Sequence, residues 1–241
     1  MKTNKVAVIF IGTDKYLNFL PEWYRRCEEK FLPDVQKQYF VFSDGKIEGM
    51  PTNISAYIEE HRPWPFITLL RFSSILKAED ELKDYDWIIF LDADAFVVDT
   101  VKSEELLTNK PFIGVHHPCH YLKMQPHNEF PGAFETDTKS LAAIKETDDT
   151  SVYFQGCLWG GRVPEVIKMI KELDRRTQED LRNDVIAKWH DESQMNKFFA
   201  ERRSRVHVLH PAYAFPEDFS SQCQFEPKIV HLSKDNSQYH K

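Results

Sequence analysis

The sequence has 241 residues, of which 41% are hydrophobic and 13% are aromatic, enough to build the core of one α/β domain. A formal net charge of -7 excludes a broad surface for nucleic acid or an anionic membrane, because such surfaces need clustered lysine and arginine. The apolar run at residues 6–11 is far shorter than the roughly 20 residues of a membrane span. We therefore expect a soluble, cytoplasmic protein with no membrane span and no nucleic-acid partner.

The first half of the chain alternates between strand and helix patterns. The predicted strands are residues 6–11, 39–42, 55–59 and 87–91, and the predicted helices are residues 18–30 and 66–82. This alternation predicts right-handed βαβ units and a largely parallel sheet with helices on both faces. In such sheets ligands bind beyond the carboxyl ends of the strands, which here are Ile11, Phe42 and Leu91.

The second half is less regular. Residues 118–150 are polar and rich in turn formers, and we expect loops over the sheet there. Helices are predicted at residues 163–180 and 191–201, and short strands at residues 206–209 and 229–232.

The four cysteines are isolated in the sequence, without a C-x-x-C pair. A disulfide or zinc set is one interpretation, but the spacing fits neither well. Reduced thiols are the preferred interpretation for Cys27, Cys119, Cys157 and Cys223.

Asp92-Ala93-Asp94 directly follows the most apolar predicted strand. In an extended segment the side chains of Asp92 and Asp94 point to the same side, and they repel each other unless a cation lies between them. Mg2+ and Mn2+ prefer such oxygen ligands, and a bound ion could neutralise a leaving nucleoside diphosphate. The alternative is an aspartate that ends the strand beside a turn aspartate.

Two further segments allow a structural and a functional interpretation. In Trp189-His190-Asp191-Glu192-Ser193 the acidic residues could simply begin a helix. The functional interpretation is that Trp189 and His190 face a sugar, while Glu192 stabilises charge at the reacting carbon. The glycine-rich residues 156–161 could form a tight turn between strands, or could let the backbone approach a ligand.

Several basic side chains also leave two interpretations open. Arg71, on the predicted helix at residues 66–82, could extend into solvent or reach a phosphate or carboxylate at the sheet edge. Near the C-terminus, Lys228, Lys234 and Lys241 could close over a diphosphate or belong to a solvated tail. The histidines at 116, 117 and 120 lie around Cys119, but their spacing fits no standard zinc site, and loop histidines are more often bystanders.

The segment that begins at Trp189 and continues through Asn196-Lys197 resembles the W-H-D-E-S-x-x-N-K motif of glycosyltransferase family 6. That family contains the ABO blood-group transferases and the α-1,3-galactosyltransferases. Other motifs follow in the same order. Residues 39–44 resemble Y-Y-V-F-T-D, 90–96 the strand with D-V-D, 117–118 the start of H-P-G-F-Y, 154–161 Y-L-G-G-F-F-G-G, and 209–213 L-S-P-E-Y.

The resemblance implies a GT-A type fold, which is a Rossmann-like mixed α/β sheet flanked by helices. It implies a single catalytic domain over residues 1–241, with a nucleotide-binding half at 1–100 and an acceptor-binding half at 101–241. The implied reaction is a retaining transfer of galactose or N-acetylgalactosamine from its UDP conjugate. The implied acceptor is the 3-hydroxyl of a β-galactoside or fucosylated galactoside, which becomes joined to the transferred sugar by an α-1,3 bond. The implied cofactor is Mn2+ or Mg2+.

The resemblance also assigns expected roles to individual residues. Asp92 and Asp94 would hold the metal, and Glu192 would lie beneath the anomeric carbon as nucleophile or charge stabiliser. The acceptor would contact His117, Trp189 and Glu192. Donor-binding residues would be Ile11, Thr13, Tyr16, Arg71, Asp92, Ala93, Asp94, Gln155, Gly156, Cys157, Asp191 and Lys234.

The sequence departs from the family pattern at informative positions. The two positions that discriminate between donors carry Gln155 and Cys157, neither of which is the usual residue, and the segment after His117-Pro118 lacks the G-F of its motif. Many short bacterial relatives have N-x-N in place of D-x-D and work without metal. Because this chain keeps both carboxylates, we predict that it depends on metal.

Two other functions remain open at this stage. A sugar-phosphate nucleotidyltransferase would need a glycine-rich, basic loop after the first strand, and residues 11–16 contain a single glycine. A non-catalytic sugar-binding module would not need the acidic pair together with Glu192.

Overall fold

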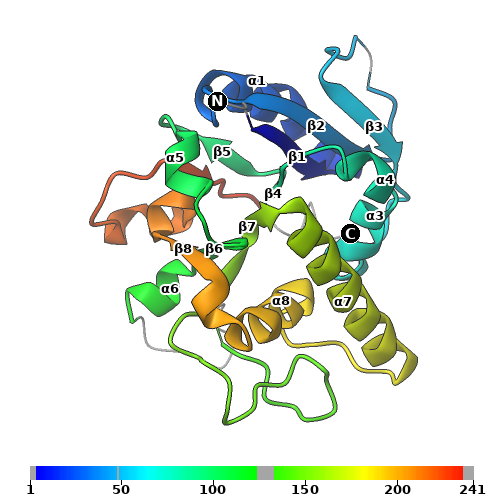
Figure 1. Ribbon diagram of the computed structural model, residues 1–241, viewed down its shortest axis with the longest axis vertical. Helices are drawn as coiled ribbons and strands as arrows, with labels where there is room; N and C mark the ends of the chain where they lie inside the picture. The colour runs from blue at the N-terminus through cyan, green and yellow to red at the C-terminus, as the bar shows by residue number, and fades with distance from the viewer. Residues whose placement is uncertain (1–3, 48, 124–132, 236–241) are drawn as a thin grey trace.

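The centre of the fold is a mixed seven-stranded sheet in the order β3-β2-β1-β4-β7-β6-β8 (Figure 1). The computed structural model describes residues 4–47, 49–123 and 133–235. The strands of this sheet are β1 (Lys5–Ile11), β2 (Gln36–Ser43), β3 (Ile54–Ile58), β4 (Trp87–Leu91), β6 (Phe112–His116), β7 (Phe154–Arg162) and β8 (Val206–Leu209). The expected mixed α/β sheet flanked by helices is therefore confirmed.

The helices account for most of the remaining regular structure. They are α1 (Leu20–Lys30), α2 (Phe66–Leu69), α3 (Arg71–Leu76), α4 (Glu79–Leu82), α5 (Ser103–Leu106), α6 (Pro118–Tyr121), α7 (Val163–Arg182) and α8 (His190–Ala200). Short 3-10 turns lie at Asp14–Phe19, Arg203–Arg205, Pro211–Tyr213 and Glu217–Gln222. No described helix is both long and apolar enough to cross a membrane.

The half of the sheet formed by β3, β2, β1 and β4 is parallel, as predicted. β1 pairs in parallel with β2 on one side and β4 on the other, and β2 pairs in parallel with β3. Residues 6–10 of β1 and all of β4 are buried, because helices cover both faces and each strand is a continuous apolar run. The carboxyl ends of β1, β2 and β4 consequently meet at one edge of the sheet.

The other half of the sheet is antiparallel around β7, which the sequence analysis did not identify as a strand. β7 pairs antiparallel with both β4 and β6, so the interpretation of residues 156–161 as a tight turn is wrong. Its glycines permit close backbone contact instead: a side chain at Gly160 would overlap the Ile88 carbonyl of β4. β6 was missed as well, and β8 pairs with it in parallel.

A second, three-stranded sheet lies beyond the end of β4. It has the order β5-β10-β9, formed by β5 (Ala95–Val97), β10 (Ile229–His231) and β9 (Phe215–Pro216). Val230 and His231 of β10 lie opposite Phe96 and Ala95. This pairing brings the C-terminal part of the chain next to the acidic pair.

The predicted helix at residues 66–82 is divided into α2, α3 and α4. The first break is at Leu70, which has φ -98° and ψ 12°. No glycine or proline lies within residues 66–82 to signal it. The break places Arg71 at the start of α3, where its side chain is buried.

In the polar segment at residues 118–150, the described residues form a loop, as expected, apart from the short helix α6. Side-chain contacts connect it to α7 and α8. Asp180 of α7 accepts hydrogen bonds from the Ser140 hydroxyl at 2.7 Å and the Leu141 amide at 2.9 Å, and Lys197 of α8 forms an ion pair with Asp148 at 2.5 Å. Residues 124–132 lie outside the described part of the chain.

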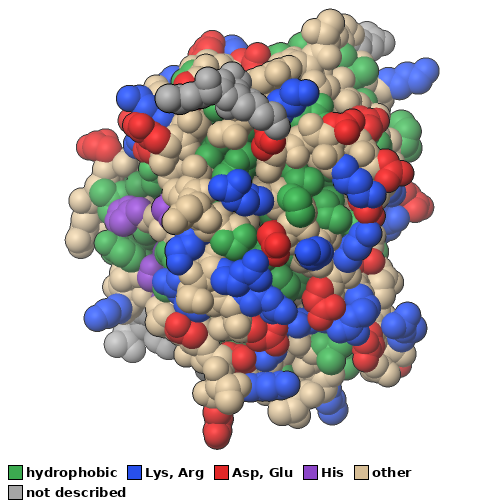
Figure 2. Space-filling view, in the orientation of Figure 1, with side chains coloured by type: hydrophobic (Ala, Val, Ile, Leu, Met, Phe, Trp, Pro, Cys, Tyr) green, Lys and Arg blue, Asp and Glu red, His purple; other side chains and the backbone are tan. Residues whose placement is uncertain are grey.

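All four cysteines are free thiols, which is the interpretation that their spacing favours. On the face shown in Figure 2, basic and acidic side chains are interspersed over the surface.

We expect Gly161→Ala to destabilise the sheet where β7 lies between β4 and β6. Gly161 has φ +147°, and a Cβ there would overlap the Pro111 carbonyl oxygen. Overpacking and backbone strain together predict a loss of about 3 kcal/mol in the free energy of unfolding. Urea denaturation measures it, with Gly49→Ala as the control because Gly49 also has a positive φ, +62°, but a Cβ there would meet nothing within 4 Å. Equal losses in the two variants would contradict the packing argument.

Candidate active site

The acidic pair lies in a tight, well-anchored turn after β4. The Asp92 amide donates to the Cys157 carbonyl of β7 at 2.9 Å, and the Asp92 carbonyl accepts from Ala95 at 3.0 Å and the Trp23 indole at 3.1 Å. Because the backbone supplies these bonds, both carboxylates remain available for other partners. Asp94 is buried, with 2% of its surface exposed.

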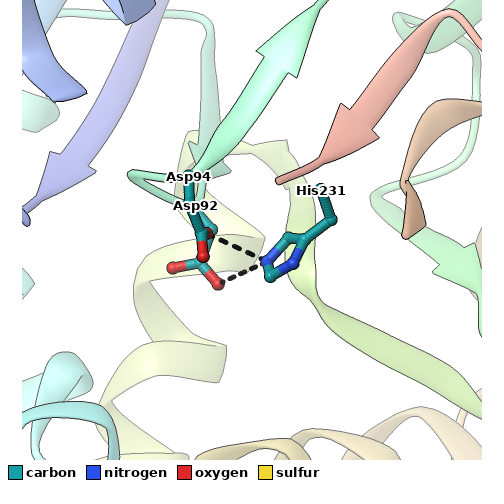
Figure 3. Close-up of side chains that lie close together, drawn as sticks. All are labelled: Asp92, Asp94 and His231. Carbon is teal, nitrogen blue, oxygen red and sulfur yellow. Dashed lines mark ion pairs between the residues drawn. The ribbon is translucent and has the colours of Figure 1, made fainter. Parts of the chain in front are cut away.

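His231, at the end of β10, faces both carboxylates (Figure 3). Its Nε2 atom is 3.0 Å from Asp94 Oδ1 and 3.7 Å from Asp92 Oδ2. One donor atom from each of the three residues lies within 4.8 Å of the others. Two carboxylates and an imidazole are ligands that Mn2+ and Mg2+ accept, so this donor set fits a divalent metal. His231 is not predicted from the sequence, because no local spacing connects it to the acidic pair.

Positive charge gathers around Asp94 in the described structure. Lys234 pairs with Asp94 Oδ2, and its ammonium lies 5.3 Å from the centre of the Tyr16 ring. Burial alone would raise the pKa of Asp94, but His231 and Lys234 outweigh it and hold that pKa below its usual range. Burial would lower the pKa of His231, whereas the two carboxylates raise it to about 10. The carboxylates are thus arranged to bind cations.

Arg71 connects Asp92 of the acidic pair to Asp191, a carboxylate in the first turn of α8. Its Nε atom is 3.0 Å from Asp191 Oδ2, and its Nη2 atom is 3.8 Å from Asp92 Oδ1. Its Nη1 atom donates to the Gly156 carbonyl at 3.2 Å, and the guanidinium lies 4.6 Å from the centre of the Phe90 ring. Arg71 is buried rather than extended into solvent, which decides between its two interpretations.

Glu192 is held at both oxygens. The Tyr153 hydroxyl donates to Oε1 at 2.8 Å, and the Gly156 amide donates to Oε2 at 2.7 Å. The β6–β7 pairing shifts between Gly114 and Val115, an irregularity that redirects backbone groups out of the ladder. The Gly156 peptide groups thereby face Glu192 and Arg71. Burial raises the pKa of Glu192 to about 7, although both hydrogen bonds oppose the shift.

Asp191 lies in the first turn of α8, but it is not an exposed residue favoured only by the helix dipole. It is 5% exposed and pairs with Arg71. Burial raises its pKa to about 6, against the attraction of Arg71. The ordinary helix-start interpretation of this segment therefore leaves out its principal contact.

Two connected clefts surround these charges. Trp64, Thr68, Arg71, Asp92 and His231 line both.

The structure brings nearly all of the predicted site residues to these clefts. The first cleft is also lined by Ile11, Thr13, Tyr16, Asp94 and Lys234. The second is also lined by His117, Gln155, Gly156, Cys157, Trp189, Asp191 and Glu192. Ala93 lines neither cleft and is buried, with 2% of its surface exposed.

Several residues at the clefts were missed, and others that were considered lie elsewhere. His61 lines the first cleft, where its Nδ1 atom is hydrogen-bonded to the Thr13 hydroxyl at 2.9 Å. Trp64 borders both clefts. In contrast, Lys228 pairs with Glu105 outside the clefts, and Lys241 lies outside the described residues.

The histidines around Cys119 do not form a metal group. The His116 Nε2 atom is 2.8 Å from His120 Nδ1, while the His117 ring accepts from the Cys119 amide at 3.2 Å. Burial lowers the pKa of His116 to about 4 and that of His117 to about 3. Within the described ranges, the only group of three or more suitable ligands is Asp92, Asp94 and His231.

Comparison with known proteins gives a consistent result. The sequence model described as Glycosyltransferase family 6 matches residues 2–240. The O-antigen biosynthesis glycosyltransferase WbnI of Escherichia coli is 28% identical over 240 residues, which are 98% of this chain and 97% of that protein. The globoside alpha-1,3-N-acetylgalactosaminyltransferase 1 of Homo sapiens is 24% identical over 221 residues, 88% of this chain but 61% of that protein. The histo-blood group ABO system transferase 1 of Rattus norvegicus is 24% identical over 226 residues, 90% of this chain and 62% of that protein.

We expect His231→Ala and Asp94→Asn each to weaken Mn2+ binding by at least about tenfold, because each removes a donor from the three-residue group. Isothermal titration calorimetry with Mn2+ and UDP measures the affinity. The control is His207→Ala, since His207 contacts the Glu105 carbonyl away from the clefts. Unchanged Mn2+ affinity in both site variants would rule out a metal at this group.

Proposed function

Since a family model matches almost the whole chain, the chain belongs to glycosyltransferase family 6, and we propose that it is a retaining hexosyltransferase. It moves galactose or N-acetylgalactosamine from a UDP conjugate to the 3-hydroxyl of a β-galactoside, with Mn2+ bound. The observation that carries this proposal is the connection of two clefts by Arg71, with the acidic pair in one and Glu192 in the other. A transferase needs such a divided site, because the diphosphate leaves the anomeric carbon of the donor sugar and the acceptor hydroxyl forms its bond to that same carbon.

The first cleft suits the nucleoside diphosphate. It lies at the carboxyl ends of β1 and β4, where ligands of parallel sheets bind. Asp92, Asp94 and His231 would hold the metal, which when bound neutralises the charge of the departing diphosphate. Lys234, which pairs with Asp94 here, can turn to a phosphate oxygen. Ile11, Thr13 and Tyr16 would line the uridine pocket.

The second cleft suits the two sugars. Asp191 and Arg71 would contact the donor sugar, while Gln155, Gly156 and Cys157 would line its other side. His117 and Trp189 would contact the acceptor galactoside. Both side chains border this cleft, and the low pKa of His117 keeps it neutral, able to bind a hydroxyl without adding charge.

Glu192 would supply the carboxylate beneath the anomeric carbon. When the bond to UDP breaks, positive charge develops at that carbon, and an ionised carboxylate in a dry site stabilises it strongly or forms a covalent bond with it. Two hydrogen-bond donors already orient Glu192, so little reorganisation is needed during the reaction.

The names of the relatives support the finer assignments. The human protein is an alpha-1,3-N-acetylgalactosaminyltransferase, which favours an α-1,3 linkage and a galactose-type donor. The bacterial protein acts in O-antigen biosynthesis, which favours a glycan acceptor. A nucleotidyltransferase finds no support in the family match, and a binding module would not need Glu192 beside the acidic pair.

We expect the wild-type protein to release UDP from UDP-galactose or UDP-N-acetylgalactosamine in the presence of lactose and Mn2+. Glu192→Gln should lower this rate by at least about 100-fold, because it removes the charge that stabilises the transition state. Its UDP affinity should remain largely intact, since Glu192 lines the second cleft. A coupled UDP-release assay and calorimetry measure the two quantities.

The matched control is Glu201→Gln, at the other end of α8. Its rate should equal that of the wild type. If neither donor turned over while the protein bound galactosides tightly, the chain would be a binding module instead. Loss of UDP binding in Glu192→Gln with an unchanged rate would overturn the role of Glu192.

A further inference from the structure

Tyr153 is a buried residue that touches both the acceptor side and the reacting carboxylate. Its side chain is fully buried. The hydroxyl donates to Glu192 Oε1 at 2.8 Å, and the backbone carbonyl accepts from the His117 amide at 2.8 Å. The ring lies edge-on to Phe134 and to His117, with centroid distances of 4.9 and 5.8 Å. Neither the sequence motifs nor the expected site included this residue.

No other side chain in the described part of the chain donates a hydrogen bond to the Glu192 carboxylate. The second bond comes from the Gly156 amide, a backbone group whose position depends on the irregular β6–β7 pairing. One oxygen is therefore fixed by the sheet and the other by Tyr153. Without the Tyr153 hydroxyl, only the Gly156 amide would hold the carboxylate, whose last torsion is broad for glutamate.

We propose that Tyr153 is a positioning residue: its hydroxyl orients Glu192 and favours its ionised form, while its carbonyl holds His117 at the acceptor side. The inference rests on the proposed role of Glu192 as the carboxylate beneath the anomeric carbon. One residue thereby sets the distance between the acceptor-binding side and the reacting carbon.

The charge state of Glu192 follows from the groups that face it. Arg71 faces it from α3, Asp191 from its own helix, Tyr153 from the residue before β7, Cys157 from β7, and Cys119 from α6. Burial raises the pKa of the Tyr153 hydroxyl and the Cys157 thiol well above their usual values. Tyr153 consequently stays protonated, and remains a donor, throughout the working pH range.

The hydrogen bond from Tyr153 changes the pKa of Glu192 in one direction, because its acceptor is a carboxylate. A hydrogen bond donated to a carboxylate favours its ionised form and lowers its pKa. Removing the Tyr153 hydroxyl should raise the pKa of Glu192 above its value of about 7. At pH 7 the variant would contain less of the ionised carboxylate, and at pH 9 most of it would be ionised again.

The test is Tyr153→Phe, which keeps the ring and the backbone carbonyl. We expect kcat to fall about 10- to 100-fold at pH 7, as for loss of a hydrogen bond to a charged group. The deficit should shrink at pH 9, and KM for the UDP-sugar should stay unchanged. The matched control is Tyr39→Phe, which removes another buried tyrosine hydroxyl that donates to a glutamate, Glu28, at 2.7 Å.

A second measurement does not depend on turnover. NMR titration of protein with 13C-labelled glutamate δ-carboxyls gives the pKa of Glu192, whose signal is assigned by its loss in Glu192→Gln. This pKa should rise in Tyr153→Phe and stay unchanged in Tyr39→Phe. An unchanged pKa, or a rate deficit that is equal at pH 7 and pH 9, would overturn the inference.

The two measurements also separate this inference from the proposed function. If the wild type transfers no sugar but the pKa of Glu192 rises in Tyr153→Phe, the orienting contact stands and the proposed transferase activity falls. If the wild type transfers sugar and Tyr153→Phe matches it, the activity stands and the positioning role falls.

Discussion

The buried guanidinium of Arg71 is the interaction on which the site depends. It joins the turn after β4, the backbone of β7 and the first turn of α8 through Asp92, Gly156 and Asp191. Three carboxylates meet near it, and their mutual repulsion would otherwise favour protonation or local opening. Removing one partner of such a buried pair typically costs about 3–5 kcal/mol. Arg71 thus keeps the acidic pair and Glu192 in one charged centre.

The sheet supplies the geometry that this centre needs. Parallel strands bring the acidic pair to the carboxyl edge, where β1 and β4 end. Antiparallel β7 then runs back beside β4, and its irregular pairing with β6 turns the Gly156 peptide groups toward Arg71 and Glu192. The small sheet contributes His231 from the other end of the chain. Each charged side chain is therefore positioned by backbone that the core makes rigid.

The sequence predicted the elements whose pattern is local. The strand at residues 87–91 coincides with β4, because five consecutive apolar residues buried on both faces carry a clear signal. β7 was missed because its glycines resemble a turn, whereas they permit close contact with neighbouring strands. The apolar strand before it pointed to the acidic pair, and the family motif pointed to Asp191 and Glu192. His231 and Tyr153 could not be identified, because their partnership with those carboxylates exists only in the folded chain.

We propose that this chain carries out a metal-dependent transfer that retains the configuration of the sugar. The most direct measurement is proton NMR of the product formed from UDP-galactose or UDP-N-acetylgalactosamine and lactose, with Mn2+ and with excess EDTA. We predict an α-linked product with Mn2+ and no product with EDTA. A β-linked product, or undiminished transfer in EDTA, would contradict it.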